Sequence, residues 1–127
     1  MSRKSVLIVD DDLDIREVLA ETLEGRGFEV ATAANGLDAL AVLRDLPVRP
    51  SVILLDLMMP IMDGYAFLDQ RRKDPVLASI PLAIVTAGHG VDRDRLGDGV
   101  DIVRKPFDVP RLVGIIHTLA AGATRSA

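Results

Sequence analysis

Short apolar runs alternate along the chain with segments of helical spacing, and this alternation restricts the possible folds more than any other feature. The clearest runs are Val6–Val9, Val52–Leu55 and Leu82–Val85, and weaker ones lie at 28–32 and 102–103. These runs are rich in β-branched residues and lack the polar alternation of a half-exposed strand. They therefore predict strands that are buried on both faces.

The segments between the runs carry apolar residues at helical spacing. The last segment has the i, i+3, i+4, i+7 stripe of an amphipathic helix, formed by Leu112, Ile115, Ile116 and Leu119. Further helices are predicted from the stripe Ile15, Val18, Leu19, Thr22 and Leu23, from Leu37, Leu40 and Leu43, and over 65–72 with Phe67 and Leu68 inward. Gly25 and Gly27 are good stop signals for the first of these helices.

A strand followed by a helix, repeated five times, predicts a parallel sheet with right-handed crossovers, because strands joined through helices run in the same direction. Helices then cover both faces, which gives a three-layer α/β fold. The 127 residues suit one domain, predicted over 1–121, with 122–127 as a frayed tail or the start of a linker.

Composition excludes several classes of protein. The formal net charge of -4 argues against a nucleic-acid-binding surface, and the absence of Cys excludes disulfides, thiol catalysis and Cys-based zinc sites. No apolar run approaches the length that crosses a membrane, and the basic start of the chain is too short for a signal segment. We therefore expect a cytoplasmic protein with no membrane partner.

Polar residues follow the predicted strands at the points where they end: Asp10, Asp11 and Asp12, then Asp56, Thr86 and Lys105. Because the carboxyl ends of parallel strands share one edge of the sheet, these side chains should converge there, where such folds bind ligands. Each residue alone also has a structural explanation. Asp12 or Asp14 can cap a helix, Asp63–Gly64 can begin one, and Lys105 can be a surface residue.

The segments "LIVDDD", "ILLDLMMPIMDGY", "AIVTA" and "VRKPFD" together resemble the response-regulator receiver domain of two-component signalling, over roughly Lys4 to Leu119. The resemblance implies a flavodoxin-like, (βα)5 sheet in the order 2-1-3-4-5. It also implies a phosphorylatable switch whose partners are a histidine kinase or phosphotransfer protein and a downstream effector protein or domain.

The resemblance also implies residue roles. Asp56 matches the phospho-acceptor, and Asp10 and Asp11 match the acidic pair that holds Mg²⁺ (or Mn²⁺) together with Asp56 and the backbone carbonyl of Met58. Lys105 would pair with Asp56 and then with the phosphoryl group, and Thr86 would hydrogen-bond another phosphoryl oxygen. Pro106 matches a position that usually follows a cis peptide bond.

Two departures from the family pattern, and the residues at two further family positions, lead to further expectations. Ile102 stands where an aromatic switch residue is common, so the switch must use another route. The Gly-rich segment after Thr86 predicts a short or partly disordered helix and an order–disorder change over 87–99 on phosphorylation. Met58 and Gly88 hold no polar side chain at two positions that influence hydrolysis, which predicts a long-lived phosphoryl group.

Other functions remain possible from the sequence. The chain could be a receiver-like interaction module that works without phosphorylation. A hydrolase that forms an aspartyl phosphate is disfavoured because Leu57 and Met58, rather than a second Asp, follow Asp56. A flavodoxin-type cofactor site is disfavoured because "DDDLD" would repel phosphate. We expect no enzyme acting on an external substrate.

Overall fold

Five parallel strands form one sheet in the order β2-β1-β3-β4-β5 in the computed structural model, which describes residues 4–97 and 99–125. The strands are β1 (Ser5–Val9), β2 (Glu29–Ala33), β3 (Val52–Leu55), β4 (Leu82–Thr86) and β5 (Asp101–Arg104). The expected α/β class and strand order are confirmed. The apolar runs predicted every strand to within two residues, because only these runs are apolar enough to be buried between two layers of helices.

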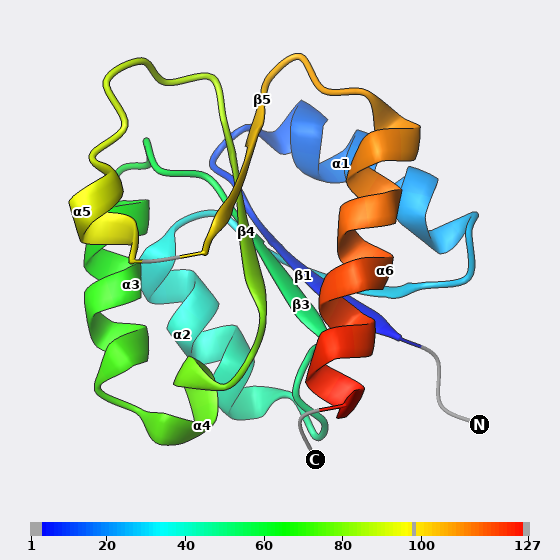
Figure 1. Ribbon diagram of the computed structural model, residues 1–127, viewed down its shortest axis with the longest axis horizontal. Helices are drawn as coiled ribbons and strands as arrows, with labels where there is room; N and C mark the ends of the chain where they lie inside the picture. Colours follow the sequence, from blue (N-terminus) through cyan, green and yellow to red (C-terminus); the bar gives the residue numbers. More distant parts are fainter. Residues whose placement is uncertain (1–3, 98, 126–127) are drawn as a thin grey trace.

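Helices pack against both faces of this sheet (Figure 1). The helices are α1 (Leu13–Glu24), α2 (Gly36–Asp45), α3 (Gly64–Arg72), α4 (Pro75–Ala78), α5 (Arg93–Leu96) and α6 (Val109–Arg125). Figure 1 shows α1 and α6 on one side of the sheet and α2, α3 and α5 on the other.

Alternate residues of the strands supply two separate hydrophobic cores. Leu7 and Val9 of β1 belong to the core under α2 and α3, whereas Val6 and Ile8 belong to the core under α1 and α6. Successive side chains of a strand point to opposite faces, so a strand covered on both sides must be apolar at every position. This is the physical reason for the continuous apolar runs.

Two of the predicted helical stripes were too wide. Val18 of α1 is 59% exposed and Leu37 of α2 is 54% exposed, although both had been assigned to buried faces. Leu19 and Leu23 of α1 are buried as predicted. The error is one of helix orientation, since spacing gives the width of an apolar stripe but not the rotation of the helix on the sheet.

The single turn α4 was not predicted, because it lies between α3 and β4 where the repeat of one helix per strand leaves no place for it. Pro75 begins this turn, and the side chain of Asp74 accepts hydrogen bonds from the amides of Val76 and Leu77. A Pro at the first helical position and an Asp before it are strong helix-start signals.

The expectation of a short helix after Thr86 is confirmed, since α5 is one turn that ends before Gly97 at φ 90. The last helix, α6, runs to Arg125, beyond the predicted domain end at 121. The division at 121 stays a prediction, and residues 126–127 of the predicted tail lie outside the described residues. No helix in the described part of the chain is long and apolar enough to cross a membrane.

Candidate functional site

Asp10 and Asp56 are neighbours because the strands before them are paired. Val9 of β1 lies opposite Leu55 of β3, so each Asp is the first residue after a matched pair. Backbone hydrogen bonds continue the ladder at this point, since the Asp10 amide donates to Ala33 and the Asp56 amide donates to Val9. The sheet register therefore brings the two carboxylates together at its carboxyl edge, as the sequence predicted.

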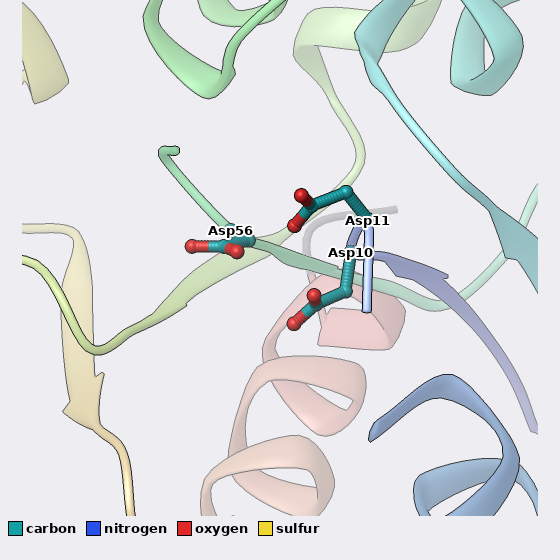
Figure 2. A group of neighbouring side chains, drawn as sticks. All are labelled: Asp10, Asp11 and Asp56. Atoms are coloured by element: carbon teal, nitrogen blue, oxygen red, sulfur yellow. The ribbon is translucent and has the colours of Figure 1, made fainter. Parts of the chain in front are cut away.

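Asp10, Asp11 and Asp56 form a compact acidic cluster, shown in Figure 2. Each contributes a carboxylate oxygen, and these oxygens lie within 4.8 Å of one another. Asp10 is 3% exposed and Asp56 is 6% exposed, whereas Asp11 is exposed. Two carboxylates held away from water and a third at the rim repel one another, and this arrangement favours a bound cation.

Lys105 Nζ donates to both buried carboxylates, at 2.6 Å from Asp10 Oδ2 and 3.4 Å from Asp56 Oδ2. The expected pairing with Asp56 is therefore present, and the closer pairing with Asp10 was not expected from the sequence. Lys105 is held by its own amide, which donates to the Thr86 carbonyl at 3.0 Å. The peptide bond between Lys105 and Pro106 is cis, as the resemblance implied.

Burial and pairing shift the pKa values of two groups in this site. Burial raises the pKa of the Asp10 carboxyl, and hydrogen bonds from Lys105 and the Asp12 amide offset this only in part. For Lys105, burial lowers the pKa, but the hydrogen bond with Asp10 and the charges of Asp10 and Asp56 outweigh it, so the pKa is raised. The ammonium group is therefore held in its charged form by the carboxylates.

Thr86, the last residue of β4, is fully buried at 0% exposure and lies at the same edge of the sheet. Its Oγ1 accepts a hydrogen bond from the Gly88 amide at 3.1 Å. A Cβ added to Gly88 would lie 3.3 Å from that oxygen and 3.6 Å from Met58 Cγ. Met58 and Gly88, the two residues at positions expected to influence hydrolysis, are thus close in space.

The loop after Asp56 is held tightly by the start of α3. Asp63 caps this helix by accepting from the Ala66 amide at 2.9 Å. A Cβ on Gly64 would lie 2.5 Å from the Asp56 carbonyl oxygen, so only glycine fits there. In the loop between Asp56 and Asp63, Ile61 has φ 69, a left-handed conformation that is costly for a β-branched residue.

Ile102, which stands where an aromatic residue was the family expectation, pairs with Ile84 and packs, half-buried, against the core under α2 and α3. Two arginines next to the site were missed from the sequence. Arg16 of α1 donates to the Asp10 carbonyl at 2.6 Å, and Arg104 of β5 donates to the Gly88 carbonyl at 2.7 Å. The only sequence signal for Arg104 was its position directly before Lys105.

A family model described as the response regulator receiver domain matches residues 6–117. Response regulator Rre1 of Synechocystis is 38% identical over 122 residues, which are 92% of this chain and 52% of that protein. Probable transcriptional regulator ycf27 of Cyanophora paradoxa is 37% identical over 123 residues, which are 94% of this chain and 49% of that protein. The chain thus spans about half the length of these curated relatives.

Two solved structures of similar fold are matched over nearly their whole length. The CheY-like receiver domain protein from Methanospirillum hungatei has a TM-score of 0.87 at 26% identity, covering 99% of this chain and 100% of that one. Chemotaxis protein CheY4 of Vibrio cholerae has a TM-score of 0.82 at 30% identity, covering 93% of this chain and 99% of that one.

Proposed function

The chain belongs to the response regulator receiver domain family, whose model matches residues 6–117, and from this membership we propose that Asp56 is the phospho-acceptor of a two-component phosphorelay. The observation that carries the proposal is the contact of Asp56 with Lys105 beside two further carboxylates. A buried carboxylate flanked by an ammonium group and a cation-binding cluster is suited to accept a phosphoryl group.

In the proposed reaction, a carboxylate oxygen of Asp56 attacks the phosphorus of a phosphohistidine. A new O–P bond forms, the N–P bond breaks, and the imidazole nitrogen leaves with the electron pair. No oxidant or reductant is needed. Lys105, 3.4 Å from Asp56, is placed to move toward a phosphoryl oxygen while its charge is kept by Asp10. Thr86 at the end of β4 is the proposed donor to another phosphoryl oxygen.

The acidic cluster fits a small divalent cation. Mg²⁺ and Mn²⁺ prefer carboxylate, carbonyl and water oxygens, and three carboxylates within 4.8 Å offer such a set. Asp10, Asp11, Asp56 and the Met58 carbonyl would hold the ion, which when bound supplies positive charge that neutralises the transferring phosphoryl oxygens. The raised pKa of Asp10 supports the same assignment, because a buried carboxylate that resists ionisation gains most from a nearby cation.

We propose a histidine kinase or phosphotransfer protein as the donor and an effector protein or domain as the target. Several relatives that are about twice as long are described as transcriptional regulators, which supports an output in gene regulation carried by a part not contained in this chain. In this proposal the protein acts in the cytoplasm, and this domain itself makes no contact with nucleic acid. A phosphorylation-independent interaction module is the alternative, but an intact Asp56, Thr86 and Lys105 favours phosphorylation.

The test is intact-mass spectrometry after incubation with acetyl phosphate and Mg²⁺. Wild-type protein should gain one phosphoryl group that is lost in acid and base, whereas Asp56→Asn should gain none. Asp69→Asn, at an exposed acid of α3, is the control and should be phosphorylated normally. A phosphorylated Asp56→Asn protein would place the acceptor elsewhere, and no phosphorylation of either protein would favour the interaction module.

A further inference from the structure

The segment from Ala87 to Val91 joins Thr86 to the single turn α5, and of its hydrophobic residues only Val91, at the far end, packs against the core under α2 and α3. Ala87, His89 and Gly90 are exposed, and Gly90 has φ 67, a conformation that favours glycine. Such a segment has little hydrophobic burial to hold it. Its position is set instead by a few hydrogen bonds at its two ends.

At the end of the segment next to the site, Gly88 is held by hydrogen bonds at both its amide and its carbonyl. The Gly88 amide donates to Thr86 Oγ1 at 3.1 Å, and the Gly88 carbonyl accepts from Arg104 Nη1 at 2.7 Å. Thr86 and Arg104 are paired in the sheet, so their side chains leave the same face. Arg104 therefore connects β5 to the residue on which the Thr86 hydroxyl depends.

At the far end, α3 holds α5. Tyr65 Oη accepts a hydrogen bond from the Asp92 amide at 2.9 Å, and the Arg95 guanidinium lies 4.5 Å from the centre of the Tyr65 ring. Asp69 adds an ion pair with Arg95 at 3.7 Å. These contacts give α5 an anchor that its four residues could not supply by helix formation alone.

We propose that Arg104 is a positioning residue that restrains this segment in the unphosphorylated form. The inference rests on the proposed function of Asp56. In this proposal the Thr86 hydroxyl moves toward a phosphoryl oxygen, and the Gly88 amide either follows it or loses its acceptor. Arg104 opposes that movement by holding the Gly88 carbonyl. The proposed change on phosphorylation then covers 87–91, the first part of the segment 87–99 expected from the sequence, because the contacts of Asp92 and Arg95 with Tyr65 hold α5 in place.

The test compares Arg104→Met with Arg104→Lys, which keeps the charge and one N–H donor. Arg111→Met, at an exposed arginine of α6, removes the same charge elsewhere. Peptide hydrogen exchange over 86–92 is measured on each protein alone, and binding of beryllofluoride, a phosphoryl mimic, is then titrated in the presence of Mg²⁺.

In Arg104→Met, exchange over 86–92 should rise about 3- to 10-fold, the effect of losing one hydrogen bond, and beryllofluoride should bind at a correspondingly lower concentration. Arg104→Lys and Arg111→Met should stay close to wild type in both measurements. The restraint is contradicted by unchanged exchange in Arg104→Met, by weaker beryllofluoride binding in that variant, or by the same gain in Arg111→Met. A wild-type protein that binds no beryllofluoride would instead overturn the proposed function of Asp56, and the restraint with it.

Discussion

Lys105 Nζ lies 2.6 Å from Asp10 Oδ2, closer than its 3.4 Å distance from Asp56 Oδ2. The ammonium group thus neutralises one member of the acidic cluster most strongly and leaves Asp56 the less tightly held carboxylate. For the proposed role of Asp56 as phospho-acceptor, the longer contact with Lys105 leaves this carboxylate freer to meet an incoming phosphoryl group. The pairing of Lys105 with Asp10 and Asp56 should also contribute to the free energy of unfolding.

Replacing Lys105 with Met should lower the free energy of unfolding at pH 7 without Mg²⁺ by about 1–3 kcal/mol, because Asp10 and Asp56 lose a charged hydrogen-bond donor. The folded-state pKa of Lys105 is raised, so its contribution is complete below its ordinary pKa of 10.5 and is lost as pH rises through the folded value. Urea unfolding at increasing pH should therefore show the two proteins converging above 10.5. A stability difference that does not change with pH would contradict this pairing.

Mg²⁺ should raise the melting temperature of the wild-type protein, and replacing Asp11 with Ala should abolish this rise. Asp11 is exposed, so its removal costs the fold little, but it takes one ligand from the acidic cluster. The matched control is Asp14→Ala, at an exposed acid of α1 outside the cluster. Differential scanning fluorimetry with and without Mg²⁺ measures both shifts, and a full shift in Asp11→Ala would place the ion elsewhere.

Replacing Met58 with Asn should speed the loss of the phosphoryl group from Asp56. Met58 is 68% exposed and close to Gly88, so the wild-type site offers no side chain there that could orient an attacking water. An amide supplies a donor and an acceptor but only positions the water, so we expect an acceleration of about tenfold, below the roughly 10²–10⁴-fold of a general acid or base. Decay of the phosphorylated mass measures the rate. Ile61→Asn, also exposed in the same loop, is the control, and an unchanged rate in Met58→Asn would count against the idea.

Replacing Gly64 with Ala should destabilise the protein by about 1–3 kcal/mol or more, as overpacking does, because the new Cβ would meet the Asp56 backbone. The control is Gly114→Ala in α6, where a Cβ meets nothing within 4 Å. There alanine should add about 0.5–1 kcal/mol through its higher helix propensity. Thermal unfolding of both variants measures the contrast, and equal stability of the two would refute the close approach of α3 to Asp56.

The sequence by itself determined the sheet and the place of the site. Val52–Leu55 is apolar at every position because β3 is buried on both faces, and the first residue after it, Asp56, must then lie at the carboxyl edge. Parallel strands bring all such residues to one edge whatever the details of packing. This is why the sequence alone groups Asp10, Asp56, Thr86 and Lys105.

Only the tertiary structure decided which of these groups touch. The closer partner of Lys105 is Asp10, and Arg104 reaches Gly88, because each contact depends on rotamers and on distances between separate elements. The exposure of Val18 has the same origin, since the rotation of α1 on the sheet is set by the whole interface. Local patterns arise from neighbours along the chain. These contacts join residues far apart in sequence, so hydrophobic periodicity cannot predict them.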